Sequence, residues 1–160
     1  MAAATQQSMR SLPSGFRVCS TAPDILYVPE LICGGLVWIL VASTHVQPNN
    51  PLGWVMFVSL FCFLMTFLWL ITFACGCLKK SSICPLLDFL YHLIAAMFYL
   101  SASVPLANVT INMQNATAVA IYPFNYYQID IAAVVLSHIT TLLYFIHCIL
   151  SACRWKSICC

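Results

Sequence analysis

Charge is scarce in this chain. Only 6% of its 160 residues are Asp, Glu, Lys or Arg, and it has four acidic side chains and four histidines. Soluble domains carry about 25% charged residues, and disordered chains combine high charge with low hydrophobicity. Because 62% of this sequence is hydrophobic, both classes are excluded. Six basic residues are too few to neutralise a run of phosphates, so we expect no nucleic-acid partner. Few catalytic constellations can be assembled either.

The basic residues divide the chain into two long apolar intervals, each with room for two membrane-spanning helices of about 20 residues. HVQPNNP at residues 45–51 interrupts the first interval, and residues 107–128 interrupt the second. We predict an all-α membrane protein, an antiparallel four-helix transmembrane bundle over residues 25–153. The predicted segments are an N-terminal tail (1–24), spans at about 25–44, 52–78, 84–106 and 129–153, and a C-terminal tail (154–160).

The basic residues also predict the topology. Cytoplasmic segments are enriched in Lys and Arg, and the two tails and the loop at Lys79 carry all six. Both termini are therefore expected in the cytoplasm. The two candidate N-glycosylation sequons begin at Asn108 and Asn115, in the loop that this rule places outside. Arg154 and Lys156 are expected to attract anionic lipids of the inner leaflet.

Cysteine is abundant, but none of the ten lies in a predicted outer loop. Disulfides do not persist in the reducing cytoplasm, whereas juxtamembrane cysteines are candidates for S-palmitoylation. Six lie near the predicted cytoplasmic boundary: Cys75, Cys77, Cys84, Cys153, Cys159 and Cys160. The alternative for each is a small apolar filler. A zinc site at Cys75, Cys77 and Cys84 would lack a fourth ligand and the usual spacing. We expect no catalytic residue, no metal site and no cofactor, with bound cholesterol or sphingolipid left open.

Small and polar residues recur every three or four positions along the predicted spans. In lipid, helices associate through small residues and interhelical hydrogen bonds, and this spacing is typical of a left-handed bundle. The predicted helix-packing seam contains Gly34, Ala95, Ala102, Ala133, Ser137 and Thr140. Four ionisable residues share these faces at similar shallow depth: Glu30, Asp88, His92 and His147. Such residues mark function by default. They form either a proton or ion relay or, in the interpretation we favour, a polar clamp that sets helix register.

Several runs of sequence resemble a known family. They are ELICGGLVWILVAS (30–43), GWVMFVS (53–59), LDFLYH (87–92), FYLSASV (98–104) and TLLYFIHCILSACRWKS (141–157). These runs closely resemble the MAL proteolipid family, tetraspan proteins of the MARVEL-domain class, and the resemblance extends over residues 12–157. It implies residence in membranes rich in cholesterol and glycosphingolipid, and roles in polarised (apical) vesicle transport and in myelin membrane organisation.

Together these observations predict a non-enzymatic membrane protein that organises ordered lipid. At 1.5 Å per residue the second and fourth predicted spans reach roughly 38 to 40 Å, more than the roughly 32 to 33 Å core of a sterol-rich membrane. Expected partners are cholesterol, glycosphingolipids, further copies of the chain and membrane protein cargo. The expected locations are the plasma membrane, apical or raft-like, and transport vesicles. The alternative is a small ion or proton channel or transporter that uses Glu30, His92 and His147.

Overall fold

The computed structural model describes residues 24–46, 49–75, 83–118 and 123–159. These residues form one 3-10 turn and four long α-helices: η2 (Asp24–Leu26), α2 (Tyr27–Ser43), α3 (Asn49–Ala74), α4 (Cys84–Ala118) and α5 (Phe124–Cys159). Four helical segments are long and apolar enough to cross a membrane. The predicted all-α four-helix architecture is confirmed.

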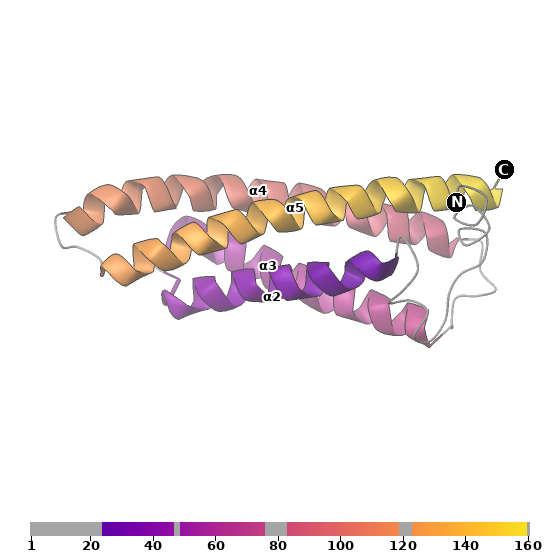
Figure 1. Ribbon diagram of the computed structural model, residues 1–160, viewed down its shortest axis with the longest axis horizontal. Coiled ribbons are helices and arrows are strands. Elements are labelled where there is room, and N and C mark those ends of the chain that lie inside the picture. The colour runs from indigo at the N-terminus through magenta and orange to yellow at the C-terminus, as the bar shows by residue number, and fades with distance from the viewer. Residues whose placement is uncertain (1–23, 47–48, 76–82, 119–122, 160) are drawn as a thin grey trace.

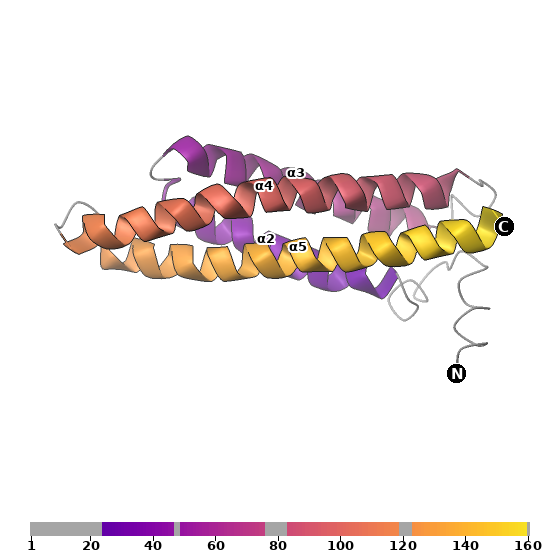
Figure 2. The same cartoon turned by 90° about the horizontal axis from the view of Figure 1, so that it is seen from above.

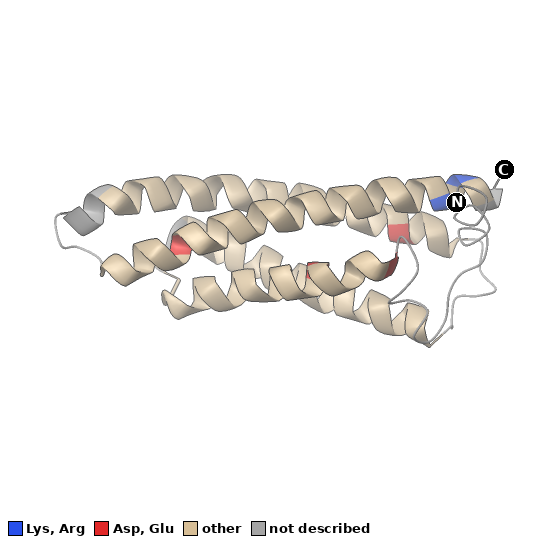
Figure 3. Cartoon of the chain, viewed as in Figure 1, with Lys and Arg blue, Asp and Glu red and all other residues tan. Residues whose placement is uncertain are grey.

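The four helices close into a ring. α2 packs against α3 and α5, and α4 packs against the same two helices. α4 and α5 lie side by side along most of their length and extend beyond the turn between α2 and α3 (Figures 1 and 2). The start of α2 lies at the opposite end, where α5 continues beyond it (Figures 1 and 2). The basic residues of this last part of α5 are blue in Figure 3, and they include Lys156 in its last turn. We call this end the basic end, and the end with the α2–α3 turn the loop end.

Polarity in this bundle is arranged as a lipid surrounding requires. Large apolar side chains face outward, among them Ile32 at 58% exposure and Met97 at 64%. Many polar side chains face inward, where hydrocarbon cannot hydrate them and partners must be found within the protein. Interior hydroxyls often bond to a carbonyl one turn back in their own helix, as Ser59 does with Val55 and Thr140 with Leu136, both at 2.8 Å.

The predicted packing seam lies in the interior of the bundle. All six of its residues are buried: Gly34, Ala95, Ala102, Ala133, Ser137 and Thr140. A Cβ atom at Gly34 would stand 2.9 Å from the hydroxyl oxygen of Tyr99 on α4 and 3.9 Å from Cγ2 of Thr140 on α5. The missing side chain of Gly34 therefore leaves room for the Tyr99 side chain, which reaches α2 from α4 across the bundle.

Two helix ends at the loop end differ from the expected ones. α4 continues to Ala118 instead of ending near residue 106, with Pro105 inside it, and α5 begins at Phe124 instead of near residue 129. The expected ends followed the fall in hydropathy. That fall indicates where a chain leaves an apolar layer, whereas a helix continues as long as its backbone hydrogen bonds do.

Because α4 continues to Ala118, the two sequons lie in a helix. Asn108 and Asn115 lie within α4 and not in a loop. The side chain of Asn108 is exposed, and that of Asn115 lies outside the described residues. Glycosylation of either asparagine stays a prediction.

Candidate functional site

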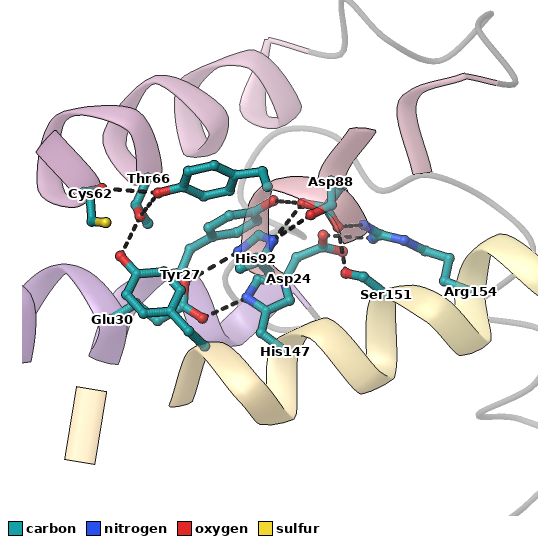
Figure 4. Close-up of polar contacts among 12 residues, drawn as sticks. Asp24, Tyr27, Glu30, Cys62, Thr66, Asp88, His92, His147, Ser151 and Arg154 are labelled. Atoms are coloured by element: carbon teal, nitrogen blue, oxygen red, sulfur yellow. Dashed lines mark hydrogen bonds and ion pairs between the residues drawn. The ribbon is translucent and has the colours of Figure 1, made fainter. Parts of the chain in front are cut away.

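The four ionisable residues singled out from the sequence meet inside the bundle (Figure 4). Glu30 of α2, Asp88 and His92 of α4, and His147 of α5 are each 0% exposed. His147 Nδ1 lies 2.8 Å from Glu30 Oε1, and His92 Nε2 lies 3.5 Å from Glu30 Oε2. The two imidazole rings lie against each other, with centroids 3.6 Å apart. Three helices therefore contribute to one polar site.

Asp88 is the acceptor at which most of the hydrogen bonds of this site converge. Its Oδ1 accepts the hydroxyl hydrogen of Tyr27, and its Oδ2 accepts from Ser151 at 2.5 Å and from Arg154 Nη2 at 2.6 Å. His92 Nδ1 lies 2.8 Å from the main-chain carbonyl oxygen of Asp88, one turn back in the same helix, and 3.3 Å from Oδ1. A carboxylate with this many donors is held in one position, and it holds α2, α4 and α5 in register.

Arg154 is buried, although the sequence suggested that it faces lipid headgroups. From the sequence it belonged to the C-terminal tail and faced lipid headgroups, but it is only 1% exposed. Its Nη1 lies 2.7 Å from Asp24 Oδ1, and its guanidinium carbon lies 5.2 Å from the centroid of the Phe73 ring. Lys156 is exposed, as expected. Arg154 turns inward because α5 continues past the apolar segment and repeats the inward face of His147 at helical spacing.

Sequence reasoning missed the members of the site nearest the basic end. Asp24 and Arg154 were assigned to the two tails, so their pairing could not be considered, and Tyr27 was not singled out. One signal was present: positions 24, 27 and 30 are spaced by three, and positions 147, 151 and 154 by four and three. Both spacings continue the inward faces of their helices.

A second set of contacts, made by hydroxyl groups, lies on the loop-end side of the charged residues. Thr66 Oγ1 on α3 lies 2.7 Å from the hydroxyl oxygens of both Tyr91 and Tyr144. The hydroxyl of Tyr91 also donates to the carbonyl oxygen of Cys62 at 3.0 Å. These bonds join α3 to α4 and α5, so all four helices take part in the polar interior.

The charges of the site do not balance. Asp24, Glu30 and Asp88 supply three carboxylates. Among the described residues Arg154 is the guanidinium that pairs with Asp24 and Asp88, while Glu30 faces the two histidines. With neutral histidines the site carries two uncompensated negative charges. Such a site can hold cations or protons, because an isolated buried charge is costly.

The loop-end half of the bundle is different. Asp130 on α5 is 0% exposed, and neither of its carboxylate oxygens has a hydrogen-bond partner within the described parts of the chain. His138 is exposed, and its Nδ1 lies 2.8 Å from the carbonyl oxygen of Val134 in its own helix. The polar contacts described above are therefore concentrated toward the basic end.

The candidate palmitoylation sites fall into three groups. Cys75 and Cys153 are exposed near the basic end. Cys84 is buried, with 3% exposure, and so is the least accessible of those described. Cys77 and Cys160 lie outside the described residues, as does the side chain of Cys159. Acylation stays a prediction at each of them.

Comparison with known proteins places this architecture in a family. The MARVEL family, described as a membrane-associating domain, matches residues 18–150. The myelin and lymphocyte proteins of Canis lupus familiaris and Homo sapiens are each 48% identical over 157 residues, which is 98% of this chain and 99% of theirs. Plasmolipin of Danio rerio is 32% identical over 108 residues, 61% of this chain and 62% of its own. No solved structure matches the chain.

These matches confirm the resemblance found in the sequence and agree with the four apolar helices. The protein is a multi-pass integral membrane proteolipid, and its domain is of a lipid-associated kind. The chain belongs to the MARVEL family of membrane-associating domains and, within it, to the family of the myelin and lymphocyte proteins.

Proposed function

We propose that this protein organises ordered, cholesterol- and sphingolipid-rich membrane without catalysing a reaction, and that it supports polarised vesicle sorting or the organisation of myelin membrane. The observation that carries the proposal is the apolar exterior of the bundle, inside which all four acidic side chains are buried. The working surface of such a protein is the face that it presents to lipid. Its relationship to the myelin and lymphocyte proteins supports the membrane setting.

The length of that apolar surface supports a preference for thick membrane. Exposed large apolar side chains extend from Ile83, the residue before α4, to Ile111 on α4, and on α5 from Phe124 to Trp155. At 1.5 Å per residue these stretches reach about 42 and 46 Å, more than the roughly 32 to 33 Å core of a sterol-rich plasma membrane. The longest helices are thus α4 and α5, the third and fourth of the four. From the sequence we expected the second and fourth. Each ångström of mismatch costs a fraction of a kcal/mol, so thinner bilayers are disfavoured.

Partition between coexisting lipid phases tests this proposal. The full-length protein, with its acyl chains intact and a fluorescent label, is reconstituted into giant vesicles that separate into ordered and disordered domains. We expect enrichment in the ordered domains. Preference for the disordered domains would contradict the proposal.

A pair of variants separates apolar length from apolar content. Ile83→Ser with Phe124→Ser shortens each exposed apolar stretch at one end, at positions 62% and 59% exposed. Met97→Ser with Leu142→Ser makes similar changes mid-helix, at positions 64% and 60% exposed. If length matters, the first pair lowers ordered-phase partition more than the second. Equal partition of both pairs would remove mismatch as the cause.

An apolar groove between α4 and α5 near the loop end is where we propose that cholesterol or the apolar part of a sphingolipid binds. Its lining is mostly apolar, as at Ala107, Ile111 and Val135, with polar groups at Thr110, Gln114 and Tyr127. A sterol suits such a lining, because it has a large apolar body and a hydroxyl. Val135→Trp should reduce labelling by a photoactivatable cholesterol, whereas Leu142→Trp, outside the groove, should not. Equal labelling of both variants would contradict this site.

The polar site favours a second candidate function, movement of protons or cations through Glu30, His92 and His147, because these three side chains are in contact. The concentration of polar contacts toward the basic end and the unpaired Asp130 beyond them count against a continuous path. Liposome flux assays decide between the two. Flux that Glu30→Gln abolishes would replace the organiser proposal by a channel or transporter, and absence of flux is the result that we expect.

A further inference from the structure

Glu30, His92 and His147 have the chemistry of a metal site. They come from α2, α4 and α5, each is fully buried, and each offers a ligand atom within 4.8 Å of those of the other two. Two imidazole nitrogens with one carboxylate oxygen form a ligand set that zinc uses in proteins, with a fourth position left for water. Ligands at about 2.1 Å from a tetrahedral zinc ion lie about 3.4 Å apart. His92 Nε2 and Glu30 Oε2 are already 3.5 Å apart.

The hydrogen bonds leave the atoms of this site ready for a metal. His92 Nδ1 donates to the main-chain carbonyl of Asp88 at 2.8 Å, so the lone pair of the neutral ring is on Nε2. His147 Nδ1 lies 2.8 Å from Glu30 Oε1, and an ion bound between them would take the place of the hydrogen that Nδ1 donates there without metal. A histidine that binds metal through one nitrogen usually donates from the other to a carbonyl or carboxylate.

Three buried atoms at this point have no hydrogen-bond partner among the described residues. They are Glu30 Oε2, His92 Nε2 and His147 Nε2. The first two lie near each other, but without the geometry of a hydrogen bond. Unpaired polar atoms in an apolar interior are costly, and two of these three, Glu30 Oε2 and His92 Nε2, lie 3.5 Å apart, the spacing of two ligands of one ion.

The charge of the ion follows from the charge of its surroundings. Arg154 offsets one of the three carboxylates of Asp24, Glu30 and Asp88, which leaves two negative charges if the histidines are neutral. A divalent cation offsets both. Protonation of both histidines would also do so, but it would place two cations in rings whose centroids are 3.6 Å apart, and like charges at that distance oppose each other.

We propose that Glu30, His92 and His147 bind one divalent transition-metal ion of the zinc class. Imidazole with carboxylate suits such an ion better than Mg²⁺ or Ca²⁺, which prefer oxygen ligands alone. The ion joins α2, α4 and α5 inside the membrane protein, against the expectation from the sequence that the chain has no metal site. This inference does not depend on the proposed function.

Direct loading tests the proposal. The full-length chain is purified in detergent with a tag that lacks histidine, its accessible cysteines are alkylated, and bound metal is removed with a chelator. It is then loaded with Zn²⁺ or Co²⁺, and unbound ion is removed by desalting. We expect one ion per chain by mass spectrometry, and with Co²⁺ the visible absorption of a four-coordinate ion with nitrogen and oxygen ligands.

Matched variants assign the ion to these residues. His92→Gln and His147→Gln keep a neutral polar side chain but should lose the bound ion and the Co²⁺ spectrum. His138→Gln is the control, because His138 also lies on α5 but is exposed and bonded to its own helix. It should keep both. Far-UV circular dichroism and elution volume report whether each variant is folded.

Two outcomes would overturn the proposal. One is folded wild-type protein that holds no more ion than empty micelles, a result that needs no variant. The other is equal binding by the wild type, His92→Gln and His147→Gln, which would place the ion elsewhere on the chain.

Discussion

Replacing Arg154 by methionine removes the cation on which the charged site depends. Arg154 pairs with Asp24 at 2.7 Å and with Asp88 at 2.6 Å, and all three side chains are at most 1% exposed. Methionine fills a similar volume but leaves both carboxylates buried without their cation. Removal of one partner from a buried ion pair costs about 3 to 5 kcal/mol, a large part of the roughly 5 to 15 kcal/mol by which proteins are stable.

The measurement is the free energy of unfolding in mixed micelles, from denaturant titration followed by far-UV circular dichroism. Arg154→Met should lower it by about 3 to 5 kcal/mol. Arg154→Lys should cost less, because lysine keeps the charge but cannot reach two carboxylates with one planar fork. Lys156→Met, two residues along at an exposed position, should change it by less than about 0.5 kcal/mol.

A second substitution shows whether charge is the cause. Asp24→Asn in the Arg154→Met background removes one of the uncompensated carboxylates, so the double variant should be more stable than the sum of the single effects predicts. Coupling between residues in contact is typically about 0.5 to 3 kcal/mol. A cost below about 1 kcal/mol for Arg154→Met, or strict additivity with Asp24→Asn, would refute the argument that buried charge pairing holds α2, α4 and α5 together.

Three further predictions concern the seam, the hydroxyl contacts and the cysteines. Gly34→Leu should destabilise the bundle in the same titration by at least the roughly 1 to 3 kcal/mol typical of overpacking, because even a Cβ atom there meets Tyr99. Gly53→Ala should not destabilise it, because nothing lies within 4 Å of a Cβ atom at that position. Thr66→Val removes two bonds between helices and should cost about 1 to 2 kcal/mol, whereas Thr72→Val, whose hydroxyl bonds to its own helix, should cost less, and equal costs would argue against the interhelical contacts. Cys153→Ser should lower the number of acyl chains measured by acyl exchange, and an unchanged number would remove this site from the candidates.

Much of the site was visible in the sequence because helical periodicity is local. Glu30, Asp88, His92 and His147 lie on the small and polar faces of their segments, and a bundle in lipid must turn such faces inward. To predict that these four residues meet, it was therefore enough to assign the helices correctly and to see that the residues lie at similar depth in the membrane. The Gly34 contact was predictable as a seam position, but its partner Tyr99 was not, because the pairing depends on the rotation of α2 against α4.

The helix ends and the charged pairs at the basic end were less predictable. Hydropathy placed the end of the third span near residue 106, but backbone hydrogen bonding continues α4 to Ala118. The same reliance on hydropathy assigned Asp24 and Arg154 to solvent-facing tails. A charged residue at the edge of an apolar segment can face water or the interior, and composition does not distinguish the two.

The sequence by itself determined that the chain has four apolar helices and which face of each turns away from lipid. It did so because both properties depend on residues only a few positions apart. Only the tertiary structure decided that Arg154 reaches Asp24 across 130 positions, that Asp88 collects donors from α2 and α5, and that two histidines meet a glutamate at one point. These features depend on the depth and rotation of helices relative to one another, which the packing of the whole bundle sets.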